Sequence, residues 1–157
     1  MLKIKIIVVD RTRSPFLKEG EVFYLKRLKP FAHIEWIEVK PARIKKGWPI
    51  HEVLRIENKA ITQRIGTRDY LVALDRKGNL YDSETLAQWL SQLSAQTKGW
   101  VCFIIGGPLG LSEELLKNSD TVLSLSRLTL THEMSRILLL EQTYRAFTIM
   151  RGHKYHK

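Results

Sequence analysis

The sequence lacks the features that mark secreted and membrane proteins. Its single cysteine, Cys102, lies in an apolar run and is expected to be a small buried residue, and a disulfide-stapled fold is excluded. No apolar run approaches the ~20 residues that a membrane-spanning helix requires. The first residues, MLKIKIIVVD, enter a strand pattern without the apolar region and cleavage site of a signal peptide. We therefore expect a cytoplasmic protein that does not bind membranes.

Linkers, internal repeats and low-complexity segments are also absent from the sequence. A chain of 157 residues is long enough for one domain with a proper core and too short for two of ordinary size. Its hydrophobic residues (44%) and charged residues (27%) are typical of a folded globular protein. We expect residues 1–157 to form a single domain.

Acidic side chains are scarce relative to basic ones, with 16 Asp and Glu against 26 Lys and Arg. The formal net charge is +10, and residues 1–50 contribute +7 of it through 12 basic and 5 acidic side chains. Such an excess favours polyanionic partners, nucleic acid before a membrane surface. The alternative is a solvated basic face that serves only solubility.

Apolar residues alternate between strand-like and helix-like spacing along the chain. The pattern predicts strands at Leu2–Val9, Ile34–Val39, Asp69–Asp75, Trp100–Ile105 and Thr121–Leu125. It predicts helices at Phe16–Leu28, Ile50–Ile65 with Gly66 as terminator, a segment capped by Ser83, Ser112–Asn118 and Glu133–Met150. It also places Phe16, Leu17, Phe23, Tyr24 and Leu28 on one side of their helix, and a turn at Arg76-Lys77-Gly78-Asn79. Strand–helix alternation of this kind predicts an α/β fold with a mainly parallel sheet and helices on both faces.

A glycine-rich turn, Gly106–Gly110, follows the fourth predicted strand. Glycines at such a position let the backbone turn sharply and approach a ligand. The turn is no dinucleotide fingerprint, because Pro108 and Leu111 stand where GxGxxG requires glycine, and no Gly-Lys-Ser/Thr follows it. A ligand loop and an ordinary tight turn both fit these residues.

The run Ser124–Thr131 leaves the fifth predicted strand and alternates small hydroxyl residues with leucines. Its backbone is suited to bind the polar atoms of a heterocycle while the leucines contact the flat faces of the ring. The alternative is a hydroxyl-rich strand end, with Thr131 or its neighbour capping the next helix. His132 is by default an ordinary loop histidine.

The last predicted helix and the tail carry a second group of functional candidates. Glu141 and Arg145 are four residues apart, so they form either a structural ion pair or contacts to a ligand or partner subunit. The tail, Arg151–Lys157, has cations for phosphates and aromatic rings for an unpaired base, but it also fits a frayed basic end. His153 and His156 lack supporting Cys or carboxylate ligands, so we expect no metal site.

The order of these motifs resembles the RlmH family of SPOUT-class methyltransferases. The resemblance is carried by Leu74-Asp75, the IGGPLGLS turn at 105–112, the run LSLSRLTLTHEMSRILLLEQTYRAF at 123–147 and the terminal KYHK. It covers the whole chain in length and element order, and it is specific mainly over residues 100–157. The family's enzymes use S-adenosylmethionine to methylate N3 of a pseudouridine in 23S ribosomal RNA.

The resemblance implies a C-terminal trefoil knot, a homodimer, and a substrate in the large subunit or the whole ribosome, without a metal. It implies a cofactor site made of Leu74, Gly106, Gly107, Gly110, Leu125, Ser126, Arg127, Leu128, Thr129 and Leu130. On the substrate side it implies His132, Glu141, Arg145, Tyr155 and His156, with the tail acting across the dimer.

The N3–H of a uracil-type base is a weak acid, and this chemistry suggests a role for each substrate-side residue. We expect His132 or His156 to assist deprotonation, Arg145 to hold the base or its anion, and Tyr155 to position the nucleotide. Two departures from the family pattern are Thr131, where a proline often stands, and Leu109, where some relatives have an acidic residue. The alternatives are a SPOUT methyltransferase of another RNA, such as tRNA, and a non-catalytic basic RNA-binding domain.

Overall fold

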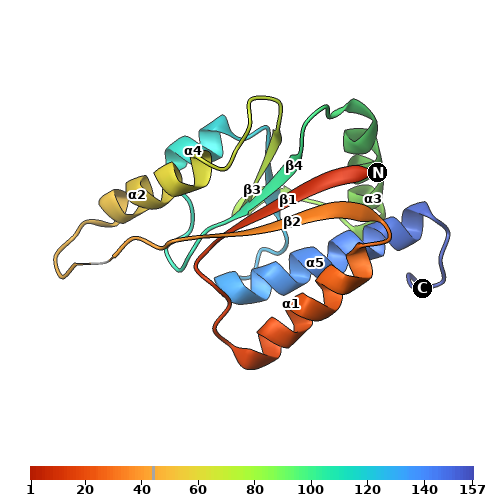
Figure 1. Cartoon of the computed structure of the whole chain (residues 1–157), viewed down its shortest axis with the longest axis horizontal. Coiled ribbons are helices and arrows are strands. Elements are labelled where there is room, and N and C mark those ends of the chain that lie inside the picture. The colour runs from red at the N-terminus through yellow and green to blue at the C-terminus, as the bar shows by residue number, and fades with distance from the viewer. Residues whose placement is uncertain (44) are drawn as a thin grey trace.

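The computed structural model describes residues 1–43 and 45–157. Within them the chain alternates strands and helices from end to end (Figure 1). The strands are β1 (Leu2–Val9), β2 (Ala32–Val39), β3 (Tyr70–Leu80), β4 (Val101–Ile105) and β5 (Thr121–Ser124). The helices are α1 (Pro15–Leu28), α2 (Ile50–Thr62), α3 (Ser83–Gln96), α4 (Glu113–Asn118) and α5 (His132–Met150). None of these helices is both long and apolar enough to cross a lipid bilayer.

The strands described here form one sheet in the order β2-β1-β4-β3-β5, and every pair is parallel. The central strand β4 is buried along its whole length, which explains its unbroken apolar sequence. Because all strands run the same way, their carboxyl ends lie at one edge of the sheet. The predicted α/β class with a mainly parallel sheet is confirmed.

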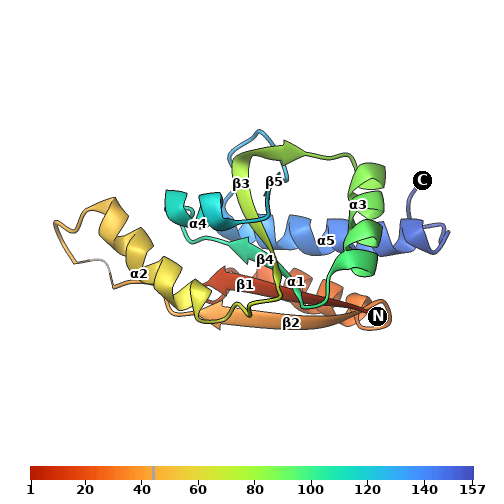
Figure 2. The ribbon, with the colours of Figure 1, turned by 90° about the horizontal axis from the view of Figure 1, so that it is seen from above.

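Helices cover both faces of the sheet (Figure 2). On one face α1, α3 and α5 pack over the sheet, and Leu28, Leu90 and Leu139 belong to this core. On the other face α2 and α4 contribute Ile61 and Leu115. Each of these side chains is at most 4% exposed, and burying one contributes about 1.5–3 kcal/mol. The sequence prediction of helices on both faces is therefore confirmed as well.

The prediction of which α1 side chains lie together on one side of the helix was partly wrong. Leu17 and Leu28 are buried, but Phe16 and Phe23 are 70% and 50% exposed. Leu17, Tyr24 and Leu28 recur at helical spacing along the stripe that faces the core, and Phe16 and Phe23 lie about 100° away around the helix axis. The exposed rings form a second stripe, which the sequence pattern did not separate from the first.

The predicted turn at Arg76–Asn79 is instead part of β3. After an irregularity between Leu74 and Asn79, the strand resumes its pairing with β5. A Cβ on Gly78 would lie 2.5 Å from the carbonyl oxygen of Val122, so this close approach of two backbones requires glycine. The turn-like residues therefore form a bulged strand segment rather than the end of the strand.

Two helix ends also differ from the prediction. The side chain of Asp82, not Ser83, caps α3 by accepting a hydrogen bond from the backbone N–H of Thr85 at 2.7 Å. Helix α2 ends at Thr62 rather than Ile65, and Gly66 follows in a separate turn. Small polar residues are interchangeable as caps, so sequence alone does not choose between neighbours. Thr131, one of the predicted caps, does cap α5, whereas Ser112, predicted as the first residue of α4, is the cap that precedes it.

Candidate functional site

A cleft of about 860 Å³ opens at the carboxyl edge of the sheet, where β3, β4 and β5 end. Its walls come from the end of the β1–α1 loop, the glycine-rich turn after β4, the loop after β5 and the first turn of α5. Ligands of parallel α/β proteins bind at this edge, and the volume is within the usual range for small-molecule sites. The cleft is therefore the candidate site.

Gly106, Gly107 and Gly110 shape the wall that follows β4. A Cβ on Gly106 would lie 2.4 Å from the carbonyl oxygen of Gly110, and Gly110 has a positive φ of 77°. The N–H of Gly110 donates to the carbonyl of Gly107 at 3.0 Å, which closes the turn. The segment is thus a tight turn that also lines the cleft, so the two interpretations of the sequence were not exclusive.

The loop after β5 is held by its own serines. The hydroxyl of Ser124 donates to the carbonyl of Ser126 at 2.9 Å, and the Ser126 hydroxyl accepts from the N–H of Leu128 at 2.9 Å. Leu128 is 75% exposed, although it lines the cleft. The loop therefore offers apolar side chains and backbone groups, because the hydroxyls of its two serines are already engaged within the loop.

His132 opens α5 at the rim of the cleft. Thr131 caps this helix, because its hydroxyl accepts from the N–H of Met134 at 3.2 Å. His132 is therefore a first-turn helix residue and not the loop histidine that was the default expectation. Burial, followed by the positive charge of Arg136, lowers its pKa below the ordinary value of 6.5. At neutral pH its imidazole is uncharged and able to accept a proton.

Glu133 joins the beginning of α5 to the β1–α1 loop. One carboxylate oxygen accepts from the N–H groups of both Arg13 and Ser14, each at 3.0 Å. The hydrogen bond from Ser14 is the main cause of its lowered pKa, so the side chain stays ionised. Ser14 lines the cleft, and the pair of bonds fixes this part of the wall.

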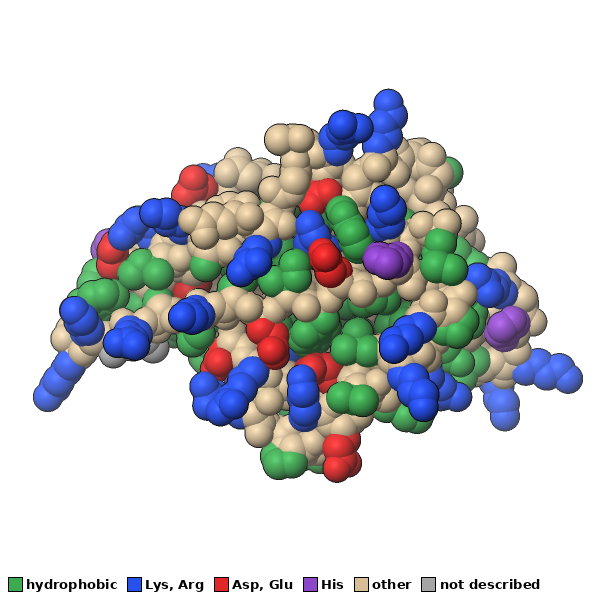
Figure 3. Space-filling view, in the orientation of Figure 1, with side chains coloured by type: hydrophobic (Ala, Val, Ile, Leu, Met, Phe, Trp, Pro, Cys, Tyr) green, Lys and Arg blue, Asp and Glu red, His purple; other side chains and the backbone are tan. Residues whose placement is uncertain are grey.

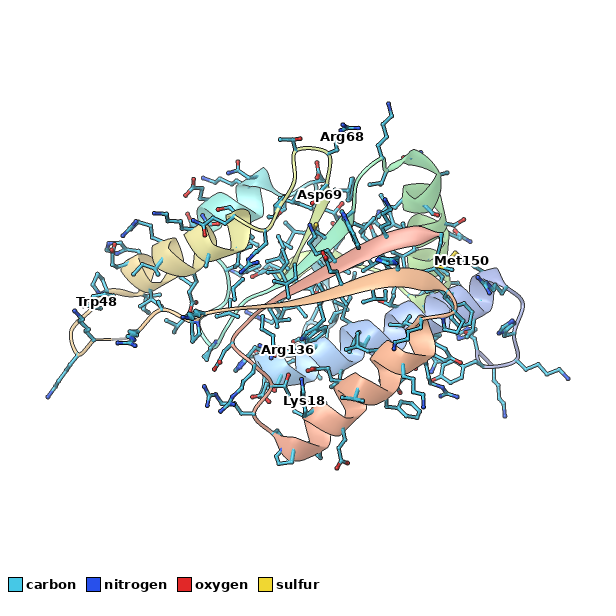
Figure 4. The ribbon with its side chains drawn as sticks, viewed as in Figure 1. Lys18, Trp48, Arg68, Asp69, Arg136 and Met150 are labelled. Carbon is cyan, nitrogen blue, oxygen red and sulfur yellow. The ribbon has the colours of Figure 1, made fainter. Side chains whose placement is uncertain are left out.

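Arg136 is fully buried between α5, α1 and β1 (Figure 4) and was not among the residues predicted from sequence. Its guanidinium donates to the Thr12 hydroxyl at 2.9 Å and to the Val9 carbonyl at 2.7 Å. The Thr12 hydroxyl in turn donates to the carboxylate of Glu21, which is 1% exposed. The available signal was its spacing of three residues from the apolar Leu139, which puts an arginine on the core side of the helix.

The tail is folded back onto α5, so the frayed-end interpretation is wrong. Arg145 and Glu141 form an ion pair at 2.6 Å, and the Tyr155 hydroxyl donates to the same Glu141 oxygen at 3.0 Å. His156 lies 3.4 Å from Arg145 and 2.7 Å from Glu84 at the start of α3, a partner that sequence reasoning missed. Burial and the bond to Glu141 raise the pKa of Tyr155 to about 12.

Within one chain, the predicted site residues fall into two separate groups. The cleft brings together Leu74, Gly106, Gly107, Gly110, Leu125, Ser126, Leu128, Thr129, Leu130 and His132. The tail cluster holds Glu141, Arg145, Tyr155 and His156, and Arg127 is outside both groups. His132 and Arg145 are thirteen positions apart on helix α5, which is about 20 Å along its axis.

Comparisons with known proteins agree with this architecture. The family described as "Predicted SPOUT methyltransferase" matches residues 2–156. "Ribosomal RNA large subunit methyltransferase H" of Halothermothrix orenii is 40% identical over 99% of this chain and 100% of that protein. The protein of the same name from Moorella thermoacetica is 41% identical, with 100% of both chains covered.

Solved structures with low sequence identity share the fold. A probable methyltransferase from Bordetella pertussis aligns with a TM-score of 0.55 at 13% identity, covering 93% of this chain and 96% of that one. A probable methylase family protein from Haemophilus influenzae aligns at 0.52 and 15% identity, covering 96% of this chain and 67% of that one. The family match over nearly every residue, together with these full-length relatives, shows that the chain belongs to the SPOUT methyltransferase family, and membership of this family implies a knotted fold.

Proposed function

We propose that this chain transfers the methyl group of S-adenosylmethionine to N3 of a pseudouridine in 23S ribosomal RNA. The observation that carries the proposal is the full-length identity of about 40% to proteins named ribosomal RNA large subunit methyltransferase H. The net charge of +10 suits a nucleic-acid substrate. We further propose that residues 1–157 act as one domain, and that a ribosomal substrate places the protein in the cytoplasm.

The cleft fits the cofactor that this reaction needs. Leu125, Leu128 and Leu130 supply apolar contacts for a planar ring, and Gly106 and Gly107 line the cleft without side chains. Leu74, Gly110, Ser126 and Thr129 complete the proposed set. S-adenosylmethionine, when bound, supplies a methyl group that is already activated by its positively charged sulfur. The chain therefore has to bind and orient the two reactants and manage the N3 proton.

His132 is the residue of the cleft best placed to remove that proton. Its imidazole lines the cleft, and its lowered pKa keeps it neutral at physiological pH. A neutral imidazole can accept a proton, as a general base must. His156, the other histidine candidate, contacts Glu84 and Arg145 away from the cleft.

The tail cluster can reach a cleft only in a second copy of the chain. We propose a homodimer in which Arg145, Tyr155 and His156 of one protomer face the cleft of its partner. Helices α1 and α5 lie side by side, and apolar side chains are exposed among charged ones over them (Figure 3). On α1, Phe16 and Phe23 are exposed and available to pack against a second copy of the chain. In the dimer, Arg145 would hold the base or its anion, Glu141 would orient Arg145 and Tyr155, and Tyr155 would position the nucleotide.

One experiment tests the proposed function and separates it from the alternatives. The full chain and labelled S-adenosylmethionine are incubated with naked 23S ribosomal RNA, isolated large subunits, whole ribosomes and total tRNA, and labelled bases are mapped. Label at a single pseudouridine of 23S RNA supports the proposal. Label in tRNA alone would indicate a related methyltransferase of another substrate. Calorimetry that detects no binding of S-adenosylmethionine would indicate an RNA-binding domain without catalysis.

A further inference from the structure

A basic segment projects from the carboxyl end of β2, on the same edge of the sheet as the cleft. We define this basic arm as residues 40–43 and 45–48, which join β2 to α2 and extend away from the core (Figure 1). Its cations are Lys40, Arg43, Lys45 and Lys46, and all four are exposed. The sequence from 40 to 49 contains no acidic residue, so the arm has a local charge of +4.

The arm concentrates four cations on one protruding segment, and none of them has an acidic partner among the residues that the structure describes. Within residues 1–43 and 45–157, Asp or Glu partners engage Lys5, Arg13, Lys18, Arg55 and Arg145, but no acidic side chain lies within 4 Å of the arm's cations. Four unpaired charges on a protruding segment repel one another and gain nothing for the fold. Such charges gain free energy when phosphates displace their counterions.

Hydrogen bonds nevertheless hold the backbone of the arm at both of its ends. At its base, the N–H of Ala42 donates to the carboxylate of Glu57 on α2 at 3.1 Å, and both residues are buried. At its outer end, Gly47 has a φ of 88° and the N–H of Trp48 donates to the carbonyl of Lys45 at 3.0 Å. Trp48 stands at this end (Figure 4), with the ammonium of Lys45 5.4 Å from its ring centroid.

The position of the arm matches the proposed substrate. Strand β2 is two positions from β4 in the sheet, so the base of the arm is about 10 Å from the strand that leads into the cleft. Arg11, at the end of the intervening strand β1, is also exposed on this edge. An RNA whose target base enters the cleft would therefore extend over the arm.

We infer that the basic arm is an RNA-docking element that binds phosphates flanking the target nucleotide, with the Trp48 indole available to stack on a base. This inference rests on the proposed function for its substrate. It adds the surface that holds the RNA outside the cleft. Phosphate contacts of this kind position a nucleic acid without reading its sequence.

The test compares two variants of the full chain that lose the same charge. The arm variant is Lys40→Gln, Arg43→Gln, Lys45→Gln and Lys46→Gln. The control variant is Arg64→Gln, Arg68→Gln, Lys98→Gln and Lys117→Gln, four exposed cations at the opposite, amino-terminal edge of the sheet. Binding to a 23S RNA fragment and to large subunits is measured over a range of salt concentrations, beside calorimetry with S-adenosylmethionine.

Each lost phosphate contact makes the negative slope of log affinity against log salt shallower by about 0.7–0.9. For the arm variant, which loses four cations, the slope should therefore be shallower than that of the wild type by about 3. The ratio of wild-type to arm-variant affinity should then fall about 60-fold between roughly 50 and 200 mM salt. The control variant should stay close to wild type, and cofactor binding should be unchanged in both. Trp48→Leu should weaken RNA binding with an unchanged salt slope.

Equal slopes for the arm and control variants would overturn the inference. So would a loss of binding to subunits with unchanged binding to RNA, because the arm would then dock on ribosomal protein. If the fourfold variant does not fold, Lys45→Gln with Lys46→Gln at the tip gives the same test at half the slope change. Wild-type protein that binds RNA through the arm but methylates none of it would contradict the proposed function and leave this inference standing.

Discussion

The buried guanidinium of Arg136 provides the sharpest test of how the cleft is held together. It crosses from α5 to the end of β1, and its two acceptors, the Val9 carbonyl and the Thr12 hydroxyl, are 1% and 6% exposed by residue. Arg136→Met keeps much of the side-chain volume and removes both hydrogen bonds. It also removes a cation that contacts the buried Thr12–Glu21 pair, although Glu21 keeps its ion pair with Lys18.

The expected loss follows from the groups left behind. Each of the two buried acceptors left without a donor costs about 1–3 kcal/mol, and Glu21 keeps Lys18 as its cationic partner. We expect Arg136→Met to lower the free energy of unfolding by about 2–6 kcal/mol and the Tm by about 4–24 °C for a chain of this size. Replacing the partner side chains with apolar residues cannot recover this free energy, because one of the two acceptors is the backbone carbonyl of Val9, which no substitution removes.

Urea denaturation measures this loss, and the same protein concentration is used for every variant because a dimer equilibrium would make stability depend on concentration. Arg55→Met is the matched control, because Arg55 is 62% exposed and pairs with Glu52 on the surface, where such pairs contribute at most about 1 kcal/mol. Combining Arg136→Met with Glu21→Gln should cost less than the sum of the single changes. A loss no larger than that of Arg55→Met, or strict additivity with Glu21→Gln, would refute the reasoning.

Three further predictions concern the proposed site. Because the pKa of His132 is lowered, its imidazole loses its proton at a lower pH than an ordinary histidine, and the methylation rate of the wild type should fall only below pH 6.5. In His132→Gln this acid limb of the pH profile should disappear, and the rate should fall about a hundredfold. Tyr155→Phe removes the hydrogen bond to Glu141 and should cost about 1 kcal/mol in urea denaturation while methylation falls much further; parallel losses would make the tail merely structural. Gly106→Ala places a Cβ 2.4 Å from the carbonyl oxygen of Gly110 and should weaken S-adenosylmethionine binding in calorimetry by about tenfold or more, whereas Gly110→Ala meets open space and should affect stability more than affinity.

The sheet and its covering helices were predictable because their signals are local and repeated. The apolar run of β4 and the helical spacing of α2 each depend on neighbouring residues alone. The errors arose where a distant segment decides. Gly78 looks like a turn residue until the backbone of Val122 is placed beside it, and Phe16 looks like a core residue until the packing face of α1 is known.

The two parts of the site differ in how far sequence could define them. The glycine turn and the loop after β5 are contiguous in sequence, and both were found as candidate ligand loops. Arg136 and Glu84 were missed because their partners are distant: Thr12 is 124 residues from Arg136, and Glu84 is 72 residues from His156. Neither pair forms a motif, and both consist of residue types that usually face solvent.

The separation between the two parts of the site follows from a single helix. His132 and Arg145 belong to α5, whose rise of 1.5 Å per residue fixes them about 20 Å apart in any rigid protomer. Flexibility of the tail does not remove this distance, because Arg145 is part of the helix itself. In a twofold dimer, a contact that brings the tail of one protomer to the cleft of its partner is made twice, so each cleft is completed by the other chain. The exposed Phe16, which lines the cleft on α1, would then lie at the junction of both protomers. The proposed dimer is therefore an arrangement in which the proposed cofactor loops and the tail residues could act on one nucleotide.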